Sequence, residues 1–140
     1  MPKPQATLTS IAMRIATHIL PVAESEYAQA DAGLITQLLM TAAEDFERAV
    51  DVRMQDIQDI QEVLRIHADQ LPNPAWLEIL DKMPVSWKLS DVSALHDEAL
   101  AILIELHAWA EGLGDQSLNR EIWHLLRIHS ERHKYALPPI

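Results

Sequence analysis

Cysteine is absent from the 140 residues of this chain. Its absence excludes a disulfide framework, a thiolate nucleophile and any cysteine-ligated zinc or iron-sulfur site. Glycine is scarce, with 3 residues, and the apolar residues recur at helical intervals throughout. This combination predicts an all-α fold. A chain of this length buries about one core, so we expect residues 1–140 to form a single helical domain.

Basic residues are also few, since 11 Lys and Arg stand against 21 Asp and Glu and the formal net charge is -10. An acidic surface repels both nucleic-acid backbones and anionic lipids. Long apolar runs are missing too, because the most apolar segment, 99–106, contains Glu105 and is far shorter than the roughly 20 residues that span a bilayer. Arg14 and His18 interrupt the apolar run near the N-terminus, which argues against a signal peptide. We therefore expect a soluble, cytoplasmic protein with no nucleic-acid or membrane partner.

One long apolar stripe dominates the sequence and has the spacing of a helix face. Its residues, in steps of mostly three and four, are Ile35, Leu39, Ala42, Phe46, Ala49, Ile57, Ile60, Leu64 and Leu71. Ser25 is a suitable N-cap, and Pro72 and Pro74 end the pattern because each disfavours helix in the residue before it. The stripe thus predicts one long central helix over about 25–70. Gly33 weakens this helix by roughly 1 kcal/mol relative to Ala and allows a bend.

Three further helices are expected around the central one. A short N-terminal helix ends before Pro21, and two C-terminal helices cover about 91–111 and 116–136. Gly112 and Gly114 separate the C-terminal pair. Connections shorter than about 20 residues favour antiparallel neighbours, so the sequence predicts an antiparallel helical bundle.

The central helix is too long for its neighbours to cover. At 1.5 Å per residue it would measure about 69 Å, whereas each C-terminal helix would measure about 33 Å. The half farther from Leu71 would still expose apolar residues, namely Leu34, Ile35, Leu38, Leu39, Ala42 and Phe46. A second copy of the chain is the simplest cover, because a long exposed apolar stripe is uncommon on a monomer. We therefore predict a homodimer; the alternative is a sharp break near Gly33 that gives a compact four-helix monomer.

Four histidines form a candidate metal site: His67, His96, His129 and His133. At about 100° per residue, His129 and His133 lie one turn apart on the apolar face of the last helix. Reversal of the chain at residues 112–114 sets His96 opposite them, and reversal after residue 71 sets His67 near His96. Because imidazole is a common metal ligand, we predict a site at the end of the bundle where the long helix ends. The alternative is that the histidines are neutral, partly buried and hydrogen-bonded to one another, to carbonyls or to water.

No familiar metal motif accompanies these histidines. The segment 129–133 lacks the Glu that follows the first His in the zinc-protease HExxH motif. Ferritin-like di-iron bundles need ExxH on two helices, and this chain offers only Glu121 with His124, both off the expected core face. The sequence therefore predicts neither family and leaves the cofactor unknown.

Arg53 and His107 form a second candidate site, for a small anionic ligand. Arg53 occupies a stripe position, where an unpaired guanidinium would be costly to bury. In an antiparallel bundle His107 lies at about the same level, so the two could bind a carboxylate or phosphate. The alternative is an ion pair of Arg53 with Asp45, Asp56 or Glu111, or exposure of its head group to solvent.

Two classes of function follow from these patterns. The sequence contains no Gly-rich phosphate loop and no nucleophile elbow, and it carries no catalytic signature. We favour a helical interaction or assembly protein that self-associates through the long helix without catalysis. The alternative is a ligand- or metal-binding bundle, with or without enzymatic activity, that has a histidine-lined site at one end.

Overall fold

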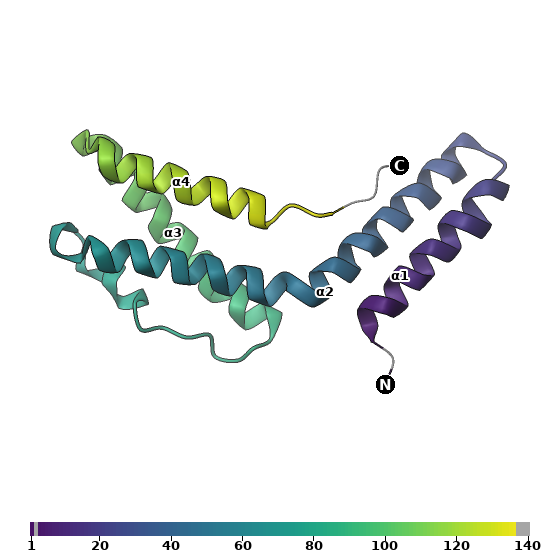
Figure 1. The fold of residues 1–140 in the computed structure, drawn as a ribbon, viewed down its shortest axis with the longest axis horizontal. Coiled ribbons are helices and arrows are strands. Elements are labelled where there is room, and N and C mark those ends of the chain that lie inside the picture. Colours follow the sequence, from purple (N-terminus) through teal and green to yellow (C-terminus); the bar gives the residue numbers. More distant parts are fainter. Residues whose placement is uncertain (2, 137–140) are drawn as a thin grey trace. The chain divides into compact units, whose positions relative to one another are not determined.

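The computed structural model describes residues 1 and 3–136, and these form helices without any strand (Figure 1). The predicted all-α class is therefore confirmed. The helices are α1 (Pro4–Arg14), α2 (Glu26–Ile66), α3 (Leu89–Leu113) and α4 (Gln116–Arg132). Shorter helical turns are Ile15–Ile19, Leu20–Val22, Ala68–Gln70 and Pro74–Ile79. Within the described part of the chain, no helix is long and apolar enough to cross a membrane.

The chain divides into two compact units. The second unit is Val50–Lys134, and the first unit comprises the described residues on either side of it. Helix α2 contributes its first part to one unit and its last part to the other. That the whole chain acts as a single domain stays a prediction.

Helix α2 is the long central helix that the apolar stripe predicts. Ser25 precedes it as expected, and its Oγ accepts a hydrogen bond from the backbone N–H of Ala28 at 3.1 Å. The helix continues through Gly33, where the sequence allowed a bend, because a glycine inside a helix costs far less than the helix gains from packing. It ends at Ile66, and a short 3₁₀ turn at Ala68–Gln70 follows.

The first unit pairs α1 with the first part of α2 over a thin core (Figure 1). All of its described buried hydrophobic residues are alanines: Ala12, Ala32, Ala43 and Ala49. Alanine lets two helices approach closely but removes little apolar area from water. Larger apolar side chains of α2 remain exposed, among them Leu34, Ile35, Leu38 and Phe46.

The connection from α2 to α3 differs from the predicted reversal. Residues 67–88 run back along α2 (Figure 1), where the Gln61 side-chain amide donates to the carbonyl of Ile79 at 2.8 Å and to that of Lys82 at 3.3 Å. Pro72 and Pro84 disfavour a continuous α-helix in this segment, and Pro74 begins only the short turn Pro74–Ile79, so the chain can return.

As a result, α3 runs in the same direction as α2. His96 near the start of α3 contacts Asp56 of α2, a full ten residues before the end of α2. Helix α4 is antiparallel to both, since its start contacts His67 through Glu121 and its end contacts Asp56 through His133. The bundle is thus antiparallel at α4, as predicted, but parallel between α2 and α3.

A continuous apolar core fills the second unit between its helices. Its residues include Ile57, Ile60 and Leu64 of α2, Val92, Ala99, Leu103 and Leu106 of α3, and Leu118, Ile122 and Leu125 of α4. Trp76 from the connection joins this core, and its indole N–H donates to the carboxylate of Glu105 at 2.6 Å. Trp76 therefore holds the returning connection against α3, by packing in the core and by its hydrogen bond to Glu105.

The C-terminal hairpin forms where the sequence predicts it. Gly114 has φ 68°, a left-handed conformation that favours glycine at a helix end. The Asp115 carboxylate caps α4 by accepting the N–H groups of Ser117 and Leu118, each at 3.1 Å. Helix α4 stops at Arg132, short of the predicted residue 136.

Tyr135 and Ala136, which follow α4, bind side chains of α2 within the first unit. Tyr135 donates its hydroxyl hydrogen to Asp45 at 2.8 Å, and the backbone N–H of Ala136 donates to Glu44 at 3.0 Å. The backbone N–H of His133 still donates to the carbonyl of His129, and that of Lys134 donates to the carbonyl of Glu131, so the helical hydrogen bonding tightens and ends before these contacts begin.

Candidate metal site

A cluster of charged and imidazole side chains lies inside the second unit. We call it the Asp56 cluster, and its members are Asp56, Asp59, His96, His129, Arg132 and His133. Asp56 is its centre, with only 1% of the residue exposed. A carboxylate at that depth is costly unless cationic or hydrogen-bonding groups surround it.

One oxygen of Asp56 faces two histidines. Nε2 of His96, on α3, donates to Asp56 Oδ2 at 2.9 Å, and Nε2 of His133 donates to the same oxygen. The two imidazole rings lie 5.8 Å apart between centroids. Oδ2 is thus held by one histidine from α3 and one that directly follows α4.

The other oxygen of Asp56 faces Arg132, the last residue of α4. Arg132 Nη1 donates to Asp56 Oδ1, and Nη2 donates to Asp59 Oδ2 at 2.8 Å. The guanidinium therefore bridges two carboxylates that lie three residues apart on α2. Such charge-assisted pairs are stronger than neutral hydrogen bonds and fix both partners in orientation.

His129 lies beside the same pair of oxygens without a hydrogen bond. Its Nε2 is 3.7 Å from Asp56 Oδ1 and 3.5 Å from Asp59 Oδ2. Neither ring nitrogen has a hydrogen-bond partner among the described residues, although His129 is only 6% exposed. A buried unpaired imidazole is unusual, since buried polar groups nearly always find a partner.

The cluster keeps Asp56 ionised. Burial by itself would raise the pKa of Asp56, but the hydrogen bonds from His96, His133 and Arg132 outweigh it and bring the pKa well below its ordinary value. Burial also opposes the charged form of Arg132, and the hydrogen bonds to Asp59 and Asp56 overcome it and raise the pKa of Arg132. The carboxylate of Asp56 and the guanidinium therefore stay charged at neutral pH.

His129 is shifted in the direction of the neutral form. Burial lowers the pKa of His129, and the nearby charge of Asp56 offsets this only in part. At neutral pH the ring is uncharged and keeps a nitrogen lone pair. A neutral imidazole is the form that binds metals.

The ligand atoms of the cluster are close enough to share a metal ion. Two sets each have their ligand atoms within 4.8 Å of one another: Asp56 with His96 and His133, and Asp56 with Asp59 and His129. Tetrahedral zinc with metal-ligand distances near 2.1 Å has its ligands about 3.4 Å apart. The separations of 3.5 and 3.7 Å from His129 Nε2 to the two carboxylate oxygens are close to this value.

The structure brings three of the four predicted histidines together and leaves the fourth apart. His96, His129 and His133 meet at Asp56, whereas His67 Nε2 forms a 2.8 Å pair with Glu121 Oε2. The separation arises because α3 runs parallel to α2, which places His96 level with residue 56 and leaves His67 at the opposite end of the unit. Glu121, which the sequence placed off the core face, is thus the partner of His67.

Arg53 and His107 lie at different levels of the second unit, and binding of an anion by either residue stays a prediction. His107 Nε2 contacts Asn119 Oδ1 at 2.8 Å, near the turn between α3 and α4. Arg53 is half-buried on α2, one turn before Asp56, and makes contacts of its own. At 1.5 Å per residue, the stretch of α2 from Arg53 to His67, which lies at the α3–α4 turn end, spans about 21 Å.

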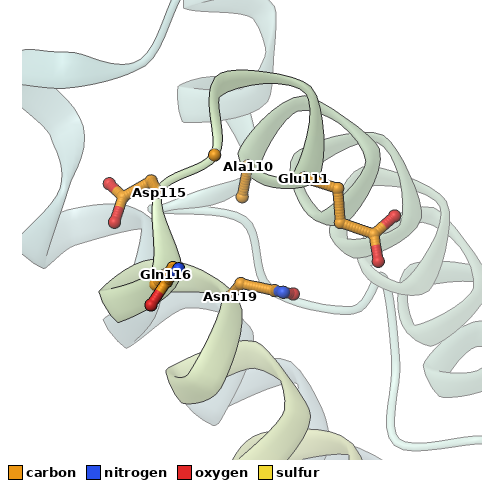
Figure 2. Close-up of a pocket in the computed structure, with 6 residues that line it drawn as sticks. Ala110, Glu111, Asp115, Gln116 and Asn119 are labelled. Atoms are coloured by element: carbon orange, nitrogen blue, oxygen red, sulfur yellow. The ribbon is translucent and has the colours of Figure 1, made fainter.

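A pocket is present at the α3–α4 turn, close to His107 (Figure 2). Its lining residues are Ala110, Glu111, Gly114, Asp115, Gln116 and Asn119. Both of its charged residues are acidic, and Figure 2 shows Glu111 and Asp115 pointing away from one another. This lining is unfavourable for a carboxylate or phosphate ligand.

The sequence did not predict Asp56, Asp59 and Arg132 as members of a site. Asp56 lies four residues before Ile60 and seven after Ala49, so it falls on the apolar stripe of α2. That position is the available signal for a buried carboxylate. Arg132 offers no comparable signal, because an arginine near a helix C-terminus is common without any site.

Comparisons with known proteins found no match among protein-family models, curated proteins or solved structures.

Proposed function

We propose that this protein binds one divalent transition-metal ion at the Asp56 cluster. The observation that supports the proposal best is the unpaired, buried His129, whose Nε2 faces Asp56 Oδ1 and Asp59 Oδ2 at ligand-to-ligand distances. A metal ion between these atoms would satisfy the imidazole and neutralise the two carboxylates. His96 and His133 supply further nitrogen ligands on the other side of Asp56.

The ligand types define the class of metal. Imidazole nitrogen and carboxylate oxygen suit zinc, iron, manganese, cobalt or nickel, whereas calcium and magnesium prefer oxygen alone. Ligation at Nε2 would require the proton that His96 and His133 each donate to Asp56 to move to Nδ1, so metal binding would break these two hydrogen bonds. Zinc is the simplest probe, because it has no redox chemistry and accepts mixed nitrogen and oxygen ligands.

The test compares zinc binding by the unmodified protein, His129→Ala and His124→Ala. His124 is an exposed histidine on the same helix and serves as the matched control. After removal of metal with a chelator, we expect zinc to bind at one ion per chain and to raise the melting temperature of the unmodified protein and of His124→Ala. His129→Ala should lose most of this effect. Failure of the unmodified protein to bind zinc, cobalt, manganese or iron(II) would refute the proposal.

A second candidate function is self-assembly through α2, which the exposed side chains of the first unit favour. Leu38 is 59% exposed and Phe46 is 61% exposed, while the core of the same unit contains only alanines among its described buried hydrophobic residues. A helix pair with so little buried area gains stability by covering its large apolar side chains. A second copy of the chain, paired along α2, would supply that cover.

A further inference from the structure

We propose that Arg132 is an internal cation that occupies part of the metal site and is displaced when metal binds. This inference rests on the proposed metal-binding function and adds a mechanism that controls it. Arg132 would stabilise the metal-free protein and would at the same time set the metal concentration at which the site fills.

The geometry places Arg132 and a metal ion in competition for the same two oxygens. Arg132 Nη1 and Nη2 hold Asp56 Oδ1 and Asp59 Oδ2. These are also the two carboxylate oxygens nearest to His129 Nε2, at 3.7 and 3.5 Å. An ion coordinated by His129 and both carboxylates would need the lone pairs that now accept hydrogen bonds from the guanidinium.

The charges explain why a cation is needed at this position before metal arrives. Asp56 and Asp59 lie three residues apart on one helix, and Asp56 is buried. The Asp59 side chain is 36% exposed, but its carboxylate shares Arg132 with that of Asp56, and a positive charge between two neighbouring carboxylates offsets their repulsion. Arginine suits the task because its planar fork can bridge two carboxylates and it remains protonated.

The position of Arg132 in the fold allows it to leave. It is the last residue of α4, and 18% of its side chain is exposed. The side chain can therefore turn toward solvent without disturbing the apolar core. His129 lies one turn earlier within α4, so it keeps its place while the guanidinium moves.

An alternative arrangement makes the opposite prediction. A metal ion held by His96, His133 and Asp56 Oδ2 would leave Arg132 on Oδ1, where the guanidinium orients the carboxylate. Loss of such an orienting partner typically weakens metal affinity by roughly 10- to 100-fold. The direction of the change in affinity upon removal of Arg132 therefore separates displacement from orientation.

The experiment measures zinc affinity and melting temperature for the unmodified protein, Arg132→Gln and Arg132→Lys, with Arg127→Gln as the control. Arg127 is an exposed arginine of α4, so its loss changes the net charge equally without touching the cluster. We expect Arg132→Gln to lower the melting temperature of the metal-free protein and to tighten zinc binding by roughly 5- to 150-fold, the usual range for coupled sites. Arg127→Gln should change neither quantity appreciably.

Arg132→Lys keeps the charge but cannot bridge both carboxylates, so its zinc affinity should lie between those of the other two proteins. If Arg132→Gln does not fold without metal, the zinc affinity of Arg132→Lys tests the displacement mechanism in its place. Zinc affinity that is unchanged or weaker in both Arg132 variants, with binding by the unmodified protein intact, would overturn the displacement mechanism alone. Absence of zinc binding by the unmodified protein and by every variant would overturn the metal-binding function and the displacement mechanism with it.

Discussion

At the scale of single residues, Asp56 determines the character of the site. It places an ionised carboxylate in an apolar core, and the other cluster members are arranged around its two oxygens. His129 alone lacks a hydrogen bond. Breaking one partner of such a network is costly because it leaves a charge or a polar atom unpaired in the core. The cluster is thus a structural element of the second unit. It is also the place where a bound ion would meet a buried imidazole without a hydrogen bond.

The shifted pKa values predict how the metal-free protein responds to acid. The pKa of His129 is lowered, so the unfolded chain binds a proton at this residue before the folded chain does. The folded state is therefore favoured above the ordinary histidine pKa of about 6.5 and loses stability as the pH falls below it. Asp56 adds a loss in the same direction below about pH 4, because its pKa is also lower in the folded protein.

Urea unfolding in the presence of a chelator, between about pH 7 and pH 5, measures this effect. We expect the free energy of unfolding to decrease as the pH is lowered. The decrease should be less steep in His129→Leu than in the unmodified protein. His124→Leu should keep the original slope, because this histidine is exposed. If the free energy of unfolding depends on pH equally in all three proteins, His129 has the same pKa in the folded and unfolded states.

At the scale of elements, the connection 67–88 has the largest consequence. A short turn after α2 would place His67 beside His96, as the sequence predicts. The returning connection instead shifts α3 along α2, so that His96 reaches Asp56 and α4 brings His129 and His133 to the same level. Which residues form the site therefore depends on the path of a segment that contains none of them.

The glycine within α2 offers a prediction about the element itself. Gly33 is in the helix interior, and an added Cβ would have nothing within 4 Å. Gly33→Ala should therefore stabilise the protein by about 0.5 to 1 kcal/mol through the higher helix propensity of alanine. Gly114→Ala should instead destabilise it by about 1 to 2 kcal/mol, because φ at Gly114 is 68°.

Thermal or urea unfolding of the two glycine variants checks this pair of opposite signs. A destabilising Gly33→Ala would show that the chain needs a flexible point in α2, as in the compact monomer that a break near Gly33 would give. Because the two substitutions add the same methyl group, a common effect of size or solubility cancels in the comparison.

At the scale of the whole molecule, the two units differ in how they use their apolar residues. The second unit buries large side chains such as Ile60, Leu64 and Ile122 completely. The first unit buries alanines and leaves larger residues in solvent. This contrast is the reason for expecting a partner surface on the first unit and a ligand site in the second.

Self-association is tested by replacing Leu38 and Phe46 together with Glu. Both side chains are exposed in the single chain, so the double variant should remain folded while losing any assembly that buries them. We expect the unmodified protein to sediment as a dimer at micromolar concentration and the double variant as a monomer. Ile104→Glu is the control, since Ile104 is 70% exposed on α3. A compact monomer for the unmodified protein would remove the assembly proposal and leave metal binding unaffected.

Much of the fold was accessible from the amino-acid sequence because it depends on local regularities. The spacing of the apolar stripe predicts α2, Ser25 predicts its start, and Gly114 predicts the end of α3. Each of these depends on residues close together in the chain. The same is true for the pairing of α3 with α4, because a tight turn leaves little freedom in the direction of the second helix.

The site was accessible only in part. The positions of His129 and His133 on one helix face, and of His96 opposite them, follow from helical period and the short turn between α3 and α4. The tertiary structure decided the separation of His67 from the other histidines, the different levels of Arg53 and His107, and the contacts of Asp56 and Arg132. The physical reason is that the path of a long, proline-containing connection is set by packing energies summed over the whole core, and local spacing does not record them.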